Sequence, residues 1–119
     1  MLELRTEEGR SGTYRLAVAA SLWARGRGLM GRRVLAEDEG LYLPGTNSIH
    51  MLFMRFPIDC VFVGDEHADG SREVVGIRER LAPWRGVVWW VRGAKAAVEL
   101  PAGAVNKAGI RVGARVWMS

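Results

Sequence analysis

The segment Ser48–Val63 reads Ser-Ile-His-Met-Leu-Phe-Met-Arg-Phe-Pro-Ile-Asp-Cys-Val-Phe-Val, an apolar run that contains a histidine, an arginine and an aspartate, His50, Arg55 and Asp59. Burying such groups is costly unless each one finds a hydrogen-bonding or charged partner. A strand that only fills a core does not need them. The segment therefore holds either a structural polar network or a binding site.

Pro57 divides this segment into two expected strands, Ile49–Phe53 and Cys60–Val63. A proline cannot donate a hydrogen bond to a strand ladder, and it restricts the backbone of the residue before it. Such a break could bring Arg55 and Asp59 onto one side of a corner. The structural interpretation is that they form an ion pair that holds this corner.

The rest of the chain is divided into short pieces by fifteen glycines, a pattern typical of short strands joined by turns. Asp69-Gly70 predicts a hairpin turn. Further strands are expected at Tyr14–Ala20, Leu41–Leu43, Glu73–Ile77, Val87–Val91, Ala94–Leu100 and Val112–Met118. Two short helices are expected, one from Ser21 to Gly31 and one from Pro101 to Ala108 with Gly109 as its stop. The predicted fold class is mainly β (α+β by content), a compact small barrel or sandwich of about eight short strands with two short helices.

Length and composition indicate an ordinary globular protein. The chain has 119 residues, of which 49% are apolar and 25% charged, and we expect a single domain over 1–119 in which 1–12 is irregular or a short strand. The only cysteine cannot form an internal disulfide. The apolar runs are far shorter than the roughly 20 residues of a membrane-spanning helix, and 1–12 does not resemble a secretory signal. We therefore expect a soluble, cytoplasmic protein with no membrane span.

The net charge and the supply of metal-ligating side chains limit which partners and metals the protein is expected to bind. The net charge of +4 is spread along the chain, whereas a nucleic-acid-binding protein more often has a dense basic stripe; nucleic acid is therefore disfavoured as a partner. One cysteine and two histidines cannot supply the usual zinc ligands. A copper(I) site from Met51, Met54, His50 or Cys60 is chemically reasonable, but methionines at this spacing more often fill a core. We expect no cofactor and no metal.

The functional hypothesis is a small binding domain with a cleft lined by His50, Met54, Arg55 and Asp59, with Trp84 nearby. Apolar pockets with a few placed polar groups are the common form of a small-molecule site, so the partner would be a small molecule or a protein. One alternative is a hydrolase-like enzyme that uses His50 and Asp59 as an acid–base pair. Another is a structural or partner-docking module with an exposed tryptophan patch. Whether the protein is an enzyme stays open.

Glu99 lies in the expected strand Ala94–Leu100, immediately before the expected second helix. Its carboxylate could favour the helix dipole, or it could pair with Arg92 or Lys95. We assign it a structural role at this stage.

Several segments together resemble a family of proteins without an established activity, the domain of unknown function numbered 192. The resemblance covers roughly Ser21 to Met118. It rests on Arg25–Arg32, Glu39–Leu43, Ile49–Phe62, Pro83–Trp84, Val98–Gly103 and Gly109–Gly113. It implies a compact, mainly β domain. The closing motif of the family usually has an aspartate where this chain has Ala114, so any loop-capping role of that carboxylate is absent here or supplied by another residue.

Overall fold

The computed structural model describes residues 2–6, 13–18, 36–46, 49–50, 56–82, 87–88 and 90–119. Its strands are β1 (Leu2–Thr6), β2 (Tyr14–Val18), β3 (Glu39–Pro44), β4 (Ile49–His50), β5 (Ile58–Glu66), β6 (Ser71–Leu81), β7 (Val87–Val88), β8 (Ala96–Pro101) and β9 (Arg115–Met118). The helix that it describes is α2 (Ala104–Ala108). The predicted mainly-β class is confirmed. The expected helix from Ser21 to Gly31 lies outside the described residues.

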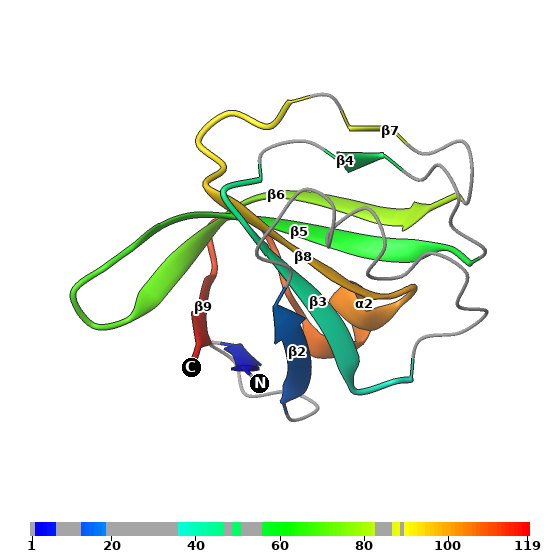
Figure 1. The fold of residues 1–119 in the computed structure, drawn as a ribbon, viewed down its shortest axis with the longest axis horizontal. Coiled ribbons are helices and arrows are strands. Elements are labelled where there is room, and N and C mark those ends of the chain that lie inside the picture. Colours follow the sequence, from blue (N-terminus) through cyan, green and yellow to red (C-terminus); the bar gives the residue numbers. More distant parts are fainter. Residues whose placement is uncertain are drawn as a thin grey trace.

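Seven of the strands form a closed barrel in the order β1-β2-β3-β8-β5-β6-β9, and pairing of β1 with β9 closes it. The pairs are antiparallel except β2 with β3, which run parallel. The strands β4 and β7 form a separate two-stranded sheet. This small sheet lies on one side of the barrel strands and α2 on the other (Figure 1). In the described part of the chain, no helix has the length and apolar character needed to cross a membrane.

The barrel strands β5 and β8 are buried on both faces because each face packs against a different layer. Successive side chains of a strand point to opposite faces. Val61 and Val98 belong to an interior cluster that also holds the apolar side of α2. The opposite faces of β3, β5 and β8 form what we call the outer apolar face, made of Leu41, Leu43, Ile58, Cys60, Phe62 and Ala97.

Three residues from the chain beside β4 and β7 pack on the outer apolar face, and we call Phe56, Val91 and Ala94 the covering residues. The approach is close at Gly76 of β6, where a Cβ atom would stand 2.7 Å from Cγ1 of Val91. A Cβ there would be closer than real Cβ atoms come, so the Val91 side chain would have to shift. The barrel therefore has a second, smaller apolar layer on its outside.

The predicted Asp69-Gly70 turn is present at the end of a long hairpin formed by β5 and β6, which projects from the barrel (Figure 1). Oδ1 of Asp69 accepts hydrogen bonds from the backbone N–H of Ser71 at 2.9 Å and from its hydroxyl at 2.6 Å. Gly70 has a φ of 83°, a left-handed conformation that glycine adopts without steric cost. These local bonds explain why the turn was readable from the sequence.

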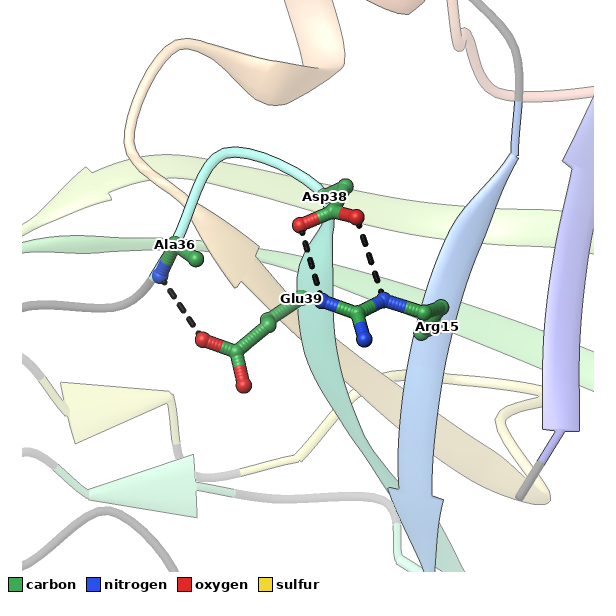
Figure 2. A network of polar contacts seen from close by, with 4 residues as sticks. All are labelled: Arg15, Ala36, Asp38 and Glu39. Carbon is green, nitrogen blue, oxygen red and sulfur yellow. Dashed lines mark hydrogen bonds and ion pairs between the residues drawn. The ribbon is translucent and has the colours of Figure 1, made fainter.

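The beginning of β3 is held beside β2 by an exposed ion pair (Figure 2). The guanidinium of Arg15 donates to both carboxylate oxygens of Asp38, at 3.1 and 3.2 Å. Next to it, Oε1 of Glu39 accepts a hydrogen bond from the backbone N–H of Ala36 at 3.0 Å. An exposed pair of this kind contributes little to stability, but it lies where the parallel pairing of β2 and β3 begins.

The second expected helix begins later than the sequence predicts. Pro101 ends strand β8, and α2 begins at Ala104 after Gly103, whose φ is 92°. Gly109 ends the helix as predicted, with a φ of 72°. The later start of the helix has a physical reason, because a carboxylate from β5 binds the first amides of α2.

Candidate functional site

Asp59 of β5 is fully buried and binds three backbone amides from two other parts of the chain. Its Oδ1 accepts a hydrogen bond from the N–H of Arg80 at 2.9 Å. Its Oδ2 accepts hydrogen bonds from the N–H groups of Gly103 and Val105, each at 3.0 Å. Gly103 has no side chain with which to cap α2, so Asp59 supplies the missing acceptor from a distant strand.

The same contact fixes the end of β6 in an unusual conformation. Arg80 has a φ of 53°, the only positive value of a non-glycine residue in the described part of the chain. Such a conformation costs about 1 kcal/mol or more and persists where surrounding contacts enforce it. The hydrogen bond from Arg80 to Asp59 is one such contact. The geometry of Asp59 is thus that of a structural anchor between β5, β6 and α2.

The five residues of the predicted cleft are only partly described. His50 lies in β4, where it is paired with Val87 of β7, but its side chain lies outside the described residues. Met54, Arg55 and Trp84 also lie outside them. The predicted cleft and the predicted ion pair of Arg55 with Asp59 therefore stay predictions.

The side of β5 on which the Asp59 carboxylate lies bears on the predicted cleft and on the predicted ion pair with Arg55. Asp59 alternates along β5 with Ile58 and Cys60, which lie on the outer apolar face. Its carboxylate consequently lies on the opposite side of the strand, with α2. The layer that contains β4 lies on the side away from α2 (Figure 1). An acid–base pair of His50 with Asp59 would also have to replace hydrogen bonds that Asp59 makes to backbone amides.

The outer apolar face contains a buried carboxyl that we assigned to a structural role from sequence. Glu99 of β8 is paired in register with Leu41 of β3 on one side and with Cys60 of β5 on the other. Cys60 is paired in turn with Arg78 of β6. Residues directly opposite each other on paired strands share a face. Glu99 and the Cys60 thiol therefore lie side by side on the outer apolar face. We call the paired residues Leu41, Glu99, Cys60 and Arg78 the row; Arg78 is at its edge and is exposed.

Glu99 is 7% exposed. Among the described residues, the fully buried side-chain atom that lacks a hydrogen-bond partner is Oγ1 of Thr6, not an oxygen of Glu99. Burial raises the pKa of Glu99 from 4.5 to about 8, because the charged form loses its hydration in apolar surroundings. The carboxyl is therefore predominantly uncharged at neutral pH. The helix α2 is capped by Asp59 and not by Glu99. The cause of the raised pKa of Glu99 is burial alone.

Cys60 is fully buried beside this carboxyl. Desolvation, and secondarily the negative charge of Glu99, raise the pKa of the Cys60 thiol well above its usual range. The thiolate is the nucleophilic form and the metal-binding form of cysteine, so this thiol is unreactive at neutral pH. The row thus presents two adjacent uncharged groups, a carboxylic acid and a thiol. Among the residues described, no three His, Cys, Asp or Glu side chains come together as metal ligands.

The signal that identifies Glu99 was present in the sequence. It is an acidic residue within the apolar stretch Ala96–Leu100, which is the same pattern that drew attention to His50 and Asp59. Its proximity to a helix suggested an interaction with the helix dipole. In the structure Asp59 caps that helix and Glu99 lies on the other face of the sheet.

Comparison with known proteins agrees with this fold. A curated relative from Thermococcus sibiricus, named UPF0127 protein, is 34% identical over 110 residues, which cover 89% of this chain and 67% of that protein. A crystal structure from Sinorhizobium meliloti 1021, of a protein described as a candidate transcription regulator, has a TM-score of 0.80 and 26% identity over 97% of this chain and 89% of that one. A protein of unknown function from Novosphingobium aromaticivorans shares the fold, with a TM-score of 0.77 and 24% identity over 97% of this chain and 81% of that one.

The model of one protein family matches residues 4–118, which is nearly the whole chain. That family is described as "Uncharacterized ACR" and is numbered 192 among the domains of unknown function. The earlier resemblance is thereby confirmed. Of its segments, Glu39–Leu43 lies in β3 and Val98–Gly103 begins in β8, whereas Arg25–Arg32 and Pro83–Trp84 lie outside the described residues. The chain belongs to the family known as domain of unknown function 192.

Proposed function

We propose that this protein is a small-molecule-binding domain whose ligand lies between the outer apolar face of the barrel and the layer that contains β4 and β7. In this proposal Glu99 and Cys60 form the barrel side of the site. The proposal retains His50, Met54, Arg55 and Trp84, which the sequence predicts as lining residues, for the other side of the site. Asp59 supports the site from behind through its bonds to Arg80 and α2.

The observation that carries the proposal is the carboxyl of Glu99, which is 7% exposed and lies on the outer apolar face beside the Cys60 thiol. Placing a carboxyl in apolar surroundings is costly unless it finds a partner. A ligand that hydrogen-bonds to this carboxyl would recover part of that free energy on binding.

Binding is favoured over catalysis by the chemistry of the described groups. The Cys60 thiol is held uncharged by its surroundings, and nucleophilic catalysis needs a thiolate or a base that produces one. Both oxygens of Asp59 accept hydrogen bonds from backbone amides. What remains is an apolar surface with a few fixed polar groups, the usual composition of a ligand site.

A thermal-shift screen against metabolites, sugars, metal salts and oligonucleotides tests the proposal, with the hit located by backbone amide NMR. We expect a hit that shifts amides of β8 and β5 and that is lost in His50→Ala and in Arg55→Ala. The matched controls are His67→Ala, in the projecting hairpin, and Arg5→Ala, an exposed residue of β1. Both controls should retain the hit. A hit that survives His50→Ala and Arg55→Ala, or that shifts only amides far from β8, contradicts the proposed site.

The description of the Sinorhizobium relative favours a second candidate, nucleic-acid binding. The net charge of +4 is compatible with it. The oligonucleotide arm of the screen distinguishes the two functions. Nucleic-acid binding predicts an affinity that falls steeply as salt is raised, because phosphate contacts release counterions. A site built on Glu99 predicts binding that changes little with salt.

A further inference from the structure

The hairpin formed by β5 and β6 ends in Asp69-Gly70, the one place in the sequence where an aspartate or an asparagine precedes a glycine. Such a pair can rearrange without an enzyme, because glycine has no side chain to hinder attack by its backbone nitrogen on the neighbouring side-chain carboxyl. The Asp69 side chain is 55% exposed, so the water that the rearrangement consumes can reach it. Asp69 is therefore a chemically sensitive residue in an exposed turn.

The rearrangement begins when the backbone nitrogen of Gly70 attacks Cγ of the protonated Asp69 carboxyl. The N–Cγ bond forms, and the carboxyl hydroxyl leaves as water with the proton of the Gly70 N–H, which gives a five-membered cyclic imide. One water molecule then opens the ring. Opening at the main-chain carbonyl gives isoaspartate, in which the chain continues through the side-chain carboxyl, and opening at the other carbonyl restores aspartate.

In the folded hairpin, each reacting group is held by a hydrogen bond that the reaction has to break. The N–H of Gly70 donates to the backbone carbonyl of His67 at 2.9 Å. Oδ1 of Asp69 accepts hydrogen bonds from the hydroxyl of Ser71 at 2.6 Å and from its backbone N–H at 2.9 Å. Ser71 is itself fully buried, and its backbone carbonyl accepts from the N–H of His67 at 2.8 Å. The turn therefore fixes both the nitrogen and the carboxyl.

We propose that Asp69 is a latent modification site, and that Ser71 keeps it as aspartate for as long as the hairpin is folded. The two bonds from Ser71 stabilise the carboxylate, and a carboxylate is a poor target because its negative charge repels the attacking nitrogen. The hydroxyl of Ser71 is the first cause of the lowered pKa of Asp69, and the charges of Arg115 and His67 act in the same direction. The reactive protonated form is therefore rarer in the fold than in the unfolded chain. This role is separate from the proposed ligand site.

Isoaspartate would disrupt the turn in which it forms. It adds one carbon atom to the backbone at the tip of the hairpin, and it moves the free carboxylate to Cα. The carboxylate then no longer lies where Ser71 donates to it. Modification at Asp69 would therefore mark molecules in which the hairpin has opened.

The test follows isoaspartate in the full-length protein during long incubation at neutral pH, below the temperature of unfolding. Mass spectrometry with electron-transfer fragmentation locates it in the tryptic peptide 56–72, where Asp59 and Asp65 are internal controls because neither precedes a glycine. Ser71→Ala is the decisive variant, and Ser119→Ala, at an exposed position, is the matched control. The same three proteins are also incubated unfolded in guanidinium chloride.

We expect isoaspartate to form at Asp69 about tenfold faster in folded Ser71→Ala than in the native protein, because losing one hydrogen bond to a charged group shifts an equilibrium by about that factor or more. Ser119→Ala should react at the native rate. In guanidinium chloride the three proteins should react alike and more than about tenfold faster than the folded native protein, because both bonds from Ser71 are then absent.

Two results would overturn the proposal. Equal rates in the folded native protein and in folded Ser71→Ala would show that Ser71 does not protect Asp69. Equal rates in the folded and the unfolded native protein would show that the turn gives no protection at all, and this comparison decides even if Ser71→Ala does not fold. Isoaspartate that forms at Asp59 or Asp65 as fast as at Asp69 would likewise contradict the assignment of the site.

Discussion

Replacing Glu99 by glutamine should make the protein more stable at neutral and alkaline pH. The pKa of Glu99 is 4.5 as a free side chain and about 8 in the fold. Between these values the folded state binds more protons than the unfolded state, so stability falls as pH rises. The stability contributed by this group is complete below about pH 4.5 and is lost once pH has risen through about 8.

The magnitude follows from the separation of the two pKa values, because one unit corresponds to about 1.4 kcal/mol. Folding at pH 7 must protonate a carboxyl that is ionised when unfolded, at a cost of about 3 kcal/mol. The cost is below about 1 kcal/mol at pH 5 and reaches about 5 kcal/mol at pH 9. Glutamine has the same shape and does not ionise, so Glu99→Gln should abolish this pH-dependent cost.

Urea denaturation of the native protein and of Glu99→Gln at these three pH values measures the effect. The free-energy difference between the two should be small at pH 5 and should increase to about 3 kcal/mol or more in favour of glutamine at higher pH. Glu79→Gln removes one exposed carboxylate from β6 and controls for the change in net charge. An equal effect of the two substitutions, or a Glu99→Gln difference that does not change with pH, would refute the reasoning.

Three further substitutions test the frame around the site. Asp59→Ala leaves three backbone amides without their acceptor and should lower the free energy of unfolding by about 3 kcal/mol or more in urea denaturation; a loss below 1 kcal/mol would contradict the anchoring role. Gly40→Ala places a Cβ 2.7 Å from a backbone oxygen of β8 and should cost about 1–3 kcal/mol by the same assay, whereas Gly64→Ala, whose Cβ meets no atom closer than 3.6 Å, should be nearly neutral; equal effects would show that the close approach is not limiting. Ser71→Ala removes the hydroxyl that donates to Oδ1 of Asp69 at 2.6 Å and should raise the pKa of Asp69, because that hydrogen bond is the first cause of its lowered pKa; an unchanged NMR titration of Asp69 would exclude that cause.

Much of the strand pattern was predictable because it depends on local chemistry. Asp69-Gly70 forms its turn through bonds within the turn itself, and Gly109 stops α2 because glycine accepts a left-handed conformation. Closure of the barrel was not predictable in the same way. It depends on β1 pairing with β9, and on parallel pairing of β2 with β3, between segments with no local signal for each other.

The candidate site shows the same limit. Asp59 and Glu99 are both acids within apolar strands, and the sequence alone does not say which layer covers which face. The amides that bind Asp59 lie 21 to 46 residues away along the chain, so its role as a helix cap could not be read from its neighbours. Glu99 is close to that helix in sequence but lies on the opposite face, next to Cys60.

The buried carboxyl of Glu99 is the feature on which the proposed site depends. NMR titration of its side-chain carboxyl carbon, in protein labelled with carbon-13, measures its protonation directly. The structure predicts a midpoint near pH 8, displaced upward from the ordinary value of 4.5. A midpoint near 4.5 would mean that the carboxyl is ionised at neutral pH, and it would contradict the apolar burial of Glu99 on which the proposed site is built.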